Sequence, residues 1–343
     1  MPDNHPQLSL VEELKEDFQS LSTVPILIVY AHSSCNCRCI MCDIWKTREH
    51  TKIGVREIEQ QLESIRRLGV RWIVFSGGEP LMNSELPEMC ALLRAEGIRL
   101  TLLSTGLLLK KCADEVAEHF NDVIVSLDGP REIHDGIRRV PGAFDLLGEG
   151  IRALRNIRPD IGITARSTLQ KANHGHLMET VKAAKQLHLD SISFLAVDVT
   201  STAFNRSLAW PVSRQTEIGL SFAELGVLEN EIEGLIAASG RDFEAGFVAE
   251  SPQKLRRLAR HFRAQLGLAE AESPLCNAPW VSAVIEADGS VRPCFFHPSI
   301  GNLSGTTLEA VINGPEGRGF RSTLDVANNP VCRNCVCSLN YRT

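Results

Sequence analysis

Eleven cysteines are distributed unevenly along this chain of 343 residues. Four lie within residues 35–42, which read Cys-Asn-Cys-Arg-Cys-Ile-Met-Cys, and five lie between residues 276 and 337. A strand would send alternate side chains to opposite faces, so a loop around a metal centre is the natural interpretation of the first group. Cys35, Cys39 and Cys42 have the spacing CxxxCxxC, and three thiolates would leave one iron of a cubane cluster open to an outside ligand.

This spacing resembles the cluster motif of the radical S-adenosylmethionine (SAM) superfamily. The resemblance implies a [4Fe–4S] cluster on Cys35, Cys39 and Cys42 whose open iron chelates SAM, and reductive cleavage of SAM to a 5′-deoxyadenosyl radical. Residues 77–80, Gly-Gly-Glu-Pro, match the family's GGEP turn, which is implied to line up the amino group of SAM. A zinc knuckle, which usually pairs CxxC with a second close pair of ligands, is the metal alternative.

The contacts to SAM that the resemblance implies extend beyond Gly77, Gly78, Glu79 and Pro80. Residues 126–129, Ser-Leu-Asp-Gly, resemble the SLDG segment of SPASM-type enzymes. There Ser126 is expected near the ribose or carboxylate of SAM, and Asp128 is expected to face the cofactor or the substrate. Arg138 and Arg166 are candidates for the SAM carboxylate, because arginine suits planar bidentate recognition. A structural or surface ion pair is the alternative for both.

Two residues of the first cysteine group differ from the family motif: one replaces an aromatic residue, and the other is an additional cysteine. Met41 stands where the family commonly has an aromatic residue, and it is expected to pack on the adenine. Cys37 is not needed as a ligand, so it is interpreted as a small residue that fills the loop. In an epimerisation, Cys37 would instead be a candidate thiol that returns hydrogen to the substrate, as would Cys90, Cys112 or Cys337.

The second cysteine group contains a hairpin and a CxxC. Residues 281–286 and 290–294 read as strands around an Asp-Gly turn, which brings Cys276 and Cys294 together. The order of motifs resembles the C-terminal twitch form of the SPASM extension. It implies one auxiliary [4Fe–4S] cluster held by Cys276, Cys294, Cys332 and Cys335. Cys337 is an alternative to Cys335 as the fourth ligand, and zinc is an alternative to the cluster because four thiolates suit either.

The elements that must position these motifs alternate regularly between strand and helix. Buried strands are expected at residues 25–31, 72–75, 98–104, 123–127, 161–168 and 191–197, with helices between them. Six such units favour an open, partial (β/α)6 TIM-like barrel with its site at the C-terminal ends of the strands. We expect an N-terminal helix over 1–24, the barrel over 25–200, a helical connecting segment over 201–272, and the twitch domain, a β-hairpin plus helix, over 273–343.

Composition narrows the class of partner. The net charge of −6 disfavours a broad nucleic-acid surface, and 43% hydrophobic residues allow a sizeable core. The longest apolar runs are too short to span a bilayer, and no signal peptide is recognisable, so no membrane partner and a cytoplasmic location are expected. Residues 252–266 form a basic amphipathic pattern, which is typical of a solvated helix face or of a surface for acidic partners or membranes.

The expected reaction is oxidation or epimerisation of a small carbohydrate-like or aminocyclitol-like metabolite, with electrons from a donor such as a flavodoxin or ferredoxin. Asp128, His297 and Asp198 are candidate general bases for a dehydrogenation. Radical modification of a ribosomal precursor peptide is the second hypothesis, and rearrangement of a nucleotide is a further outcome. A non-catalytic iron–sulfur electron carrier or redox sensor is the hypothesis from another class.

Overall fold

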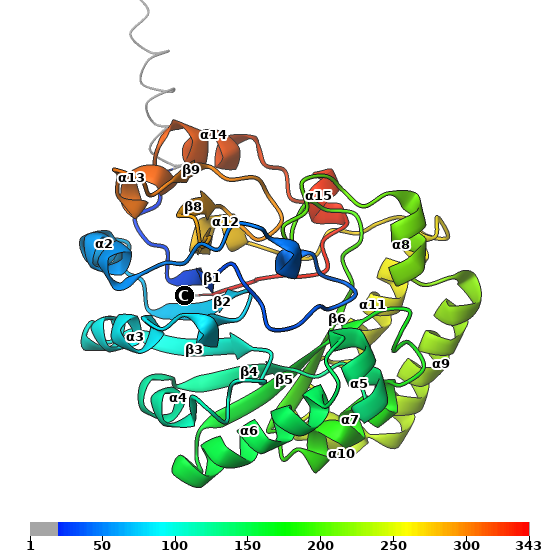
Figure 1. Cartoon of the computed structure of the whole chain (residues 1–343). Coiled ribbons are helices and arrows are strands. Elements are labelled where there is room, and N and C mark those ends of the chain that lie inside the picture. Colours follow the sequence, from blue (N-terminus) through cyan, green and yellow to red (C-terminus); the bar gives the residue numbers. More distant parts are fainter. Residues whose placement is uncertain (1–19, 343) are drawn as a thin grey trace, which may run out of the picture.

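Six parallel strands form the barrel sheet of this protein. The computed structural model describes residues 20–342, so the expected helix over 1–24 lies largely outside the described residues. In the sheet each strand pairs in parallel with the next along the chain (Figure 1). The strands are β1 (Ile26–His32), β2 (Trp72–Gly77), β3 (Arg99–Ser104), β4 (Asp122–Ser126), β5 (Gly162–Leu169) and β6 (Ser191–Ala196). The expected partial barrel is confirmed.

The connecting helices cover the outer face of this sheet, because each presents an apolar stripe to it. They are α2 (Val55–Arg67), α3 (Leu86–Ala95), α4 (Ala113–His119), α6 (Ala143–Ile157) and α7 (Leu177–Gln186). The short helix α5 (Arg131–Arg138) was not expected from the sequence. It has only eight residues, contains Gly136 and ends at Arg139 in the left-handed region. Two turns of 3-10 helix, η1 (Ile44–Lys46) and η2 (Pro80–Met82), follow β1 and β2.

The inner face of the sheet is less completely buried than the outer face. Along β5, Ile163, Ala165 and Leu169 are at most 1% exposed and pack against the helices. The alternating residues Thr164 and Arg166 point to the other face and are only partly buried. A closed eight-stranded barrel fills its interior with side chains, whereas this open one retains exposed polar groups along its hollow face.

The segment after β6 is helical, as expected, but it begins with an irregular stretch. Its helices are α8 (Val212–Ile218), α9 (Phe222–Ala238), α10 (Gly240–Glu244) and α11 (Pro252–Gln265). Helix α9 packs against α7 and α11, and α11 also contacts β6. We call residues 197–214, which include the irregular stretch and the start of α8, the strap.

The C-terminal region continues the barrel sheet instead of forming a separate layer. Strand β7 (Ser282–Ile285) pairs in parallel with β1. Strands β8 (Ser290–Arg292) and β9 (Gly301–Asn302) follow antiparallel, which completes a nine-stranded sheet in the order β6-β5-β4-β3-β2-β1-β7-β8-β9. The expected hairpin is therefore present, but the expected boundary near residue 273 does not separate two independent sheets.

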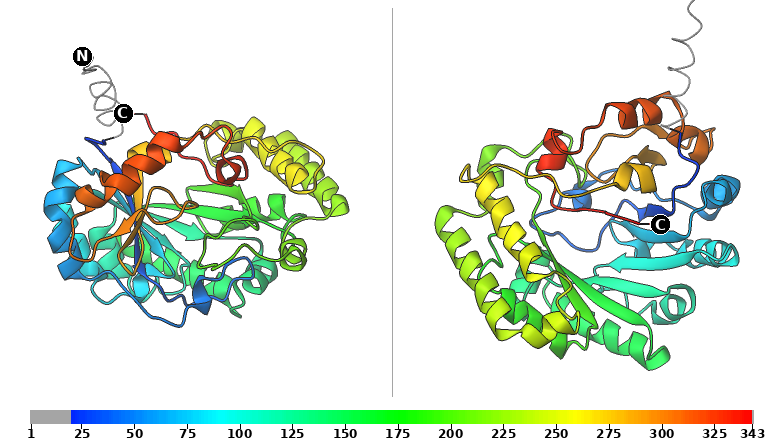
Figure 2. Two further views of the ribbon diagram at one scale, coloured as in Figure 1. Left: turned by 90° about the horizontal axis from the view of Figure 1, so that it is seen from above. Right: turned by 180° about the vertical axis from the view of Figure 1, so that it is seen from behind.

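Four short helices complete this region: α12 (Ala278–Val281), α13 (Leu308–Ile312), α14 (Pro315–Thr323) and α15 (Pro330–Arg333). Together with the final residues they lie across the open side of the barrel, between the edge near α2 and the edge near α11 (Figure 2). No helix in the described part of the chain has the length and apolar character needed to cross a membrane.

Candidate active site

The cysteine loop leaves the C-terminal end of β1 and is held there by the Gly-Gly-Glu-Pro turn after β2. The backbone N–H groups of Gly78 and Glu79 donate to the carbonyls of His32 and Ser34, both at 2.9 Å. A Cβ atom on Gly78 would lie 2.0 Å from the Ser34 carbonyl oxygen, and Gly77 has a φ of +118°. The close approach that these glycines permit is therefore to the cysteine loop of the chain itself.

The Glu79 carboxylate is 0% exposed and accepts four hydrogen bonds from within the protein. The donors are Leu81 N–H, the Ser104 hydroxyl, and both the N–H and the hydroxyl of Thr105. Burial raises the pKa of Glu79 despite these donors. The side chain thus ties β2 to the end of β3, and contact of residues 77–80 with SAM stays a prediction.

Helix α5 fixes the middle of the cysteine loop. The N–H groups of Arg38 and Ile40 each donate to a carbonyl at the C-terminal end of α5, at 3.1 Å. From the same end, the guanidinium of Arg138 lies 3.5 Å from Cys39 Sγ and 2.5 Å from a carboxylate oxygen of Asp128. Asp128 is 0% exposed and also accepts from the Thr168 N–H at 2.9 Å. The buried Arg138–Asp128 ion pair therefore contacts Cys39, a predicted cluster ligand.

This geometry revises the roles expected for Asp128 and Arg138. Arg138 forms a structural ion pair, which was the alternative to binding the SAM carboxylate. Burial opposes its charge, but Asp128 and the neighbouring Cys39 and Cys37 outweigh that effect and raise the pKa of Arg138. The Asp128 carboxylate is enclosed and paired, which disfavours a role as general base. Nearby, burial lowers the pKa of His134 to about 3, so this ring is neutral.

Among the thiols of the loop, Cys39 has the surroundings that most favour a thiolate. A hydrogen bond from Cys37 and the charge of Arg138 lower the pKa of Cys39, against the opposing effect of burial. Thiolates are the form that ligates iron. Cys35, Cys39 and Cys42 lie close enough for their charges to interact. Cys37 is 1% exposed and hydrogen-bonded to Cys35 and Cys39, which favours its interpretation as a filler over a role as hydrogen donor.

The strap covers the far side of the cysteine loop with three side chains that the sequence did not identify. Arg206 donates to the Met41 carbonyl at 3.3 Å, and Arg214 donates to the Ile40 carbonyl. The indole N–H of Trp210 donates to Asp43 at 2.7 Å, and its ring lies 3.8 Å from the Arg206 guanidinium. Arg206 also pairs with the carboxylate of Asp198 at 2.7 Å, so this candidate base is buried in an ion pair as well.

Of the other residues predicted to contact SAM, two are brought together on the hollow face. Ser126 and Arg166 are register partners on β4 and β5, and both are partly buried. Arg166 Nε lies 3.3 Å from the Ser193 hydroxyl, and Arg166 forms no ion pair within residues 20–342. Met41 packs against the core at the base of the loop. Contact of these residues with SAM stays a prediction.

Four of the five C-terminal cysteines surround one cavity. Cys276, Cys294, Cys332 and Cys335 line it together with apolar side chains and His297. Cys337 does not line this cavity, although its carbonyl accepts from the Cys335 thiol at 2.7 Å. Burial raises the pKa of Cys294 to about 11. Within residues 20–342, in either cysteine region, no group of three or more His, Cys, Asp or Glu side chains is arranged to hold a metal ion.

His297 belongs to the wall of this cavity and is 4% exposed. Its Nε2 lies 3.4 Å from Cys332 Sγ, and its ring contacts Phe320 at a centroid distance of 4.8 Å. The ring faces Cys332, a predicted cluster ligand, which disfavours the role of general base at the substrate. Cys90 is buried in α3. Cys112 is partly buried before α4, where burial and the charges of Glu115 and Glu79 raise the pKa of its thiol.

An aromatic group links the two cysteine regions. Phe295, which follows Cys294, lies 5.8 Å from Tyr30 on β1 and 5.1 Å from Phe204 of the strap, measured between ring centroids. Phe296 lies 5.4 Å from Phe295. The sequence did not predict this group, because its members come from three distant segments.

Comparison with known proteins agrees with this geometry. Residues 29–194 match the radical SAM superfamily, and residues 276–336 match the iron–sulfur cluster-binding domain called SPASM. The Fe-coproporphyrin III synthase of Methanosarcina barkeri is 31% identical over 157 residues, which cover 43% of this chain and 38% of that protein. The pre-heme d1 synthase of Dinoroseobacter shibae is 32% identical over 166 residues, which cover 46% of this chain and 40% of that protein. The chain thus spans less than half of the length of these relatives.

Solved structures show the same fold. SuiB of Streptococcus suis bound to S-adenosylmethionine has a TM-score of 0.65 at 15% identity, covering 99% of this chain and 79% of that one. The anSMEcpe structure with bound AdoMet has a TM-score of 0.64 at 17% identity, covering 89% and 84%. The chain belongs to the radical SAM superfamily and carries a C-terminal SPASM-type domain. A radical SAM domain implies SAM and a [4Fe–4S] cluster, and a SPASM domain implies auxiliary iron–sulfur clusters. The two cysteine sets described above supply the thiolates that such clusters take, and their role as ligands stays a prediction.

Proposed function

We propose that this protein is a radical SAM enzyme that oxidises a small-molecule substrate. When bound, the first cluster supplies the electron that cleaves SAM to a hydrogen-abstracting radical, and the auxiliary cluster supplies a centre that can accept an electron. Cys35, Cys39 and Cys42 would hold the first, and Cys276, Cys294, Cys332 and Cys335 the second. The observation that carries the proposal is the single cavity formed by these last four cysteines beside the open side of the barrel.

The protein's own residues have distinct roles in this proposal. Arg138, paired with Asp128, contacts and orients Cys39. The backbone at Gly77 and Gly78 positions the first residues of the cysteine loop. Ser126 and Arg166 present polar groups on the hollow face, where they would orient SAM or substrate. Tyr30, Phe204 and Phe295 form an apolar boundary that excludes water between the two cysteine regions.

We rank a small molecule ahead of a precursor peptide as the substrate, and we place it in the pocket that borders the C-terminal cysteines. Epimerisation is less favoured, because Cys37 is enclosed between two predicted cluster ligands. A flavodoxin or ferredoxin in the cytoplasm is the electron donor that we infer.

A second candidate within the same class is oxidation of a tetrapyrrole side chain. It is favoured by the relatives named Fe-coproporphyrin III synthase and pre-heme d1 synthase, each above 30% identity over its matched segment. Coproporphyrin III therefore belongs in the substrate panel beside amino alcohols and cyclitols.

The test uses anaerobically reconstituted protein, as wild type, as the Cys35/Cys39/Cys42→Ala variant and as Cys294→Ala. We expect about eight irons per chain in wild type and about four in the triple variant. Formation of 5′-deoxyadenosine should be abolished in the triple variant and retained in Cys294→Ala. With a true substrate, wild type should give a product lighter by two hydrogens, and Cys294→Ala should not.

Either of two results would overturn the proposal. Absence of 5′-deoxyadenosine from wild type that holds its full iron would support a non-catalytic electron carrier. A product of unchanged mass that takes up solvent deuterium at carbon would identify an epimerase instead.

A further inference from the structure

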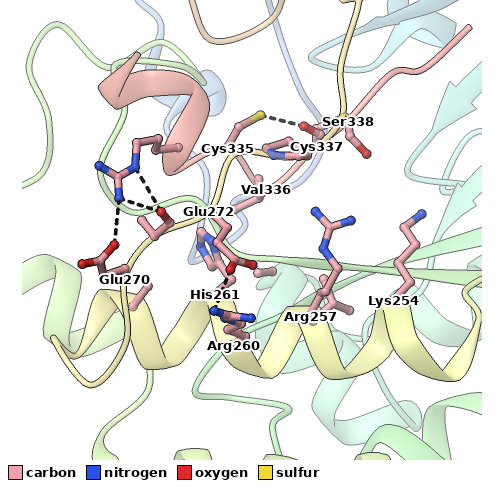
Figure 3. Close-up of a pocket in the computed structure, with 16 residues that line it drawn as sticks. Lys254, Arg257, Arg260, His261, Glu270, Glu272, Cys335, Val336, Cys337 and Ser338 are labelled. Atoms are coloured by element: carbon pink, nitrogen blue, oxygen red, sulfur yellow. Dashed lines mark hydrogen bonds and ion pairs between the residues drawn. The ribbon is translucent and has the colours of Figure 1, made fainter. Parts of the chain in front are cut away.

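The pocket beside the auxiliary cysteines has a basic wall that none of the residue roles above explains. It is bounded by α11 on one side and by the segment 335–338 on the other (Figure 3). Lys254, Arg257, Arg260 and His261 contribute from α11, and Arg333 contributes from α15. This wall is part of the basic pattern over residues 252–266.

Most of the positively charged side chains on α11 form ion pairs with glutamates. A side chain on α11 without such a pair is therefore a candidate for binding an anionic ligand. Arg256 and Arg263 form bidentate pairs with Glu233 and Glu229 of α9, away from the pocket. Arg260 pairs with Glu272 at 2.6 Å. Arg257 is exposed and has no hydrogen-bond or ion-pair partner in residues 20–342, and its side chain stands upright in the pocket beside Lys254 (Figure 3).

The other basic groups of the pocket, Lys254 and Arg333, have longer ion pairs than Arg260 has. Lys254 reaches Glu250 only at 3.4 Å, and that carboxylate is 3% exposed and accepts from the Phe194 N–H. Arg333 donates to the Ala271 carbonyl and lies 3.9 Å from Glu270. Burial lowers the pKa of His261 to about 4, so the ring is neutral and can act only as a hydrogen-bonding group.

The pocket also adjoins both the cavity of the auxiliary cysteines and the end of β6 in the barrel sheet. Cys335 lines both this pocket and the cavity of the auxiliary cysteines. Ala196, the last residue of β6, also lines the pocket. Cys337 is close enough to both Lys254 and Arg166 for their charges to act on it. A molecule in the pocket would thus adjoin the auxiliary site and the Arg166 side of the barrel.

We propose that this pocket binds the oxyanion group of the substrate, a carboxylate or a phosphate, with Arg257 and Lys254 as its ligands. An arginine without a partner in a concave site matches the fork geometry of both anions. This inference rests on the proposed function and narrows its substrate class to anionic small molecules. The anion is held at α11, so the reacting carbon extends toward the hollow face of the sheet.

The test measures binding of citrate and of pyrophosphate to the reconstituted holoenzyme by titration calorimetry. Arg257→Gln is compared with Arg256→Gln, the adjacent residue whose charge is already paired with Glu233. We expect saturable binding of at least one probe, weakened roughly tenfold to hundredfold by Arg257→Gln, as for loss of one charge-assisted hydrogen bond. Arg256→Gln should change it by less than about threefold.

The probes also identify the source of the anion. Tighter binding of citrate indicates a carboxylate substrate, and tighter binding of pyrophosphate indicates a phosphate ester. Absence of saturable binding, or equal weakening by both substitutions, would overturn the site. Formation of 5′-deoxyadenosine by the same wild-type samples separates the two proposals: its loss overturns the proposed function, whereas its retention without probe binding overturns only the pocket.

Discussion

The two cysteine regions are held in place by different kinds of interaction. The loop at residues 35–42 is fixed from three distant segments, through backbone hydrogen bonds at Gly78, the buried pair Arg138–Asp128 and the strap arginines. The C-terminal cysteines are placed mainly by short local turns and apolar packing, with Asn329 capping α15 and Asn277 bonded to the final residues. The site that must position SAM is therefore built from buried polar contacts, and the auxiliary site is built from contacts that tolerate more adjustment.

The largest expected difference between the regions is at their glycines. Gly78→Ala would place a methyl group 2.0 Å from the Ser34 carbonyl oxygen and displace the cysteine loop. Because misplacement of about 1 Å can cost about a hundredfold in rate, we expect SAM cleavage to fall at least that far. Gly289→Ala is the matched variant in the hairpin, where φ is +82° and the nearest atom is 3.3 Å away. It should lose only about 1–2 kcal/mol of stability. Equal loss of 5′-deoxyadenosine formation in both variants would contradict the comparison.

The buried pair behind Cys39 should carry the next largest effect. Asp128→Asn leaves the Arg138 guanidinium buried without a counter-charge, which typically costs about 3–5 kcal/mol. Urea unfolding of the metal-free protein measures this directly. Glu63→Gln is the control, since its pair with Arg67 is exposed and should be worth at most about 1 kcal/mol. A loss below about 1 kcal/mol for Asp128→Asn would show that the loop does not depend on this pair.

The strap offers a smaller and more local test. Trp210→Phe keeps an aromatic ring over Arg206 but removes the indole N–H that donates to Asp43. The expected loss is about 1 kcal/mol, with a modest decrease in SAM cleavage and no change in auxiliary iron. Iron analysis and 5′-deoxyadenosine formation check it. Loss of iron from the C-terminal site would mean that the strap supports both regions equally.

The smallest effect is expected at Cys337, and the neighbouring Cys335 provides the contrast. Cys337→Ser should leave about eight irons per chain, because Cys337 does not line the cavity of the other four cysteines. Cys335→Ser should reduce that content to about four if the auxiliary cluster is lost. The reverse result would make Cys337 the fourth ligand, which was the alternative left open by the spacing.

Local patterns predicted much of this molecule. The six strands and the hairpin follow from hydrophobic runs and turn residues that act within a few positions of each other. The cysteine motifs follow from spacing. The roles of Asp128 and Arg138 were less well predicted, because Arg138 lies on α5, a helix of only eight residues that contains Gly136 and was not expected from the sequence. Arg206, Trp210 and Arg214 were missed, since their function arises only where the strap meets a loop far away in the sequence.

The place of β1 in the middle of the nine-stranded sheet has a consequence for biosynthesis. β1 is the first strand to leave the ribosome among those described, yet one of its two neighbours, β7, is synthesised near the end. Throughout translation of the barrel, one edge of β1 offers unpaired backbone groups, which are a template for aggregation. Premature termination before residue 282 would leave that edge permanently open. Yield of native protein should therefore depend on chaperone capacity during translation, and incomplete chains should be insoluble even though they contain the whole barrel.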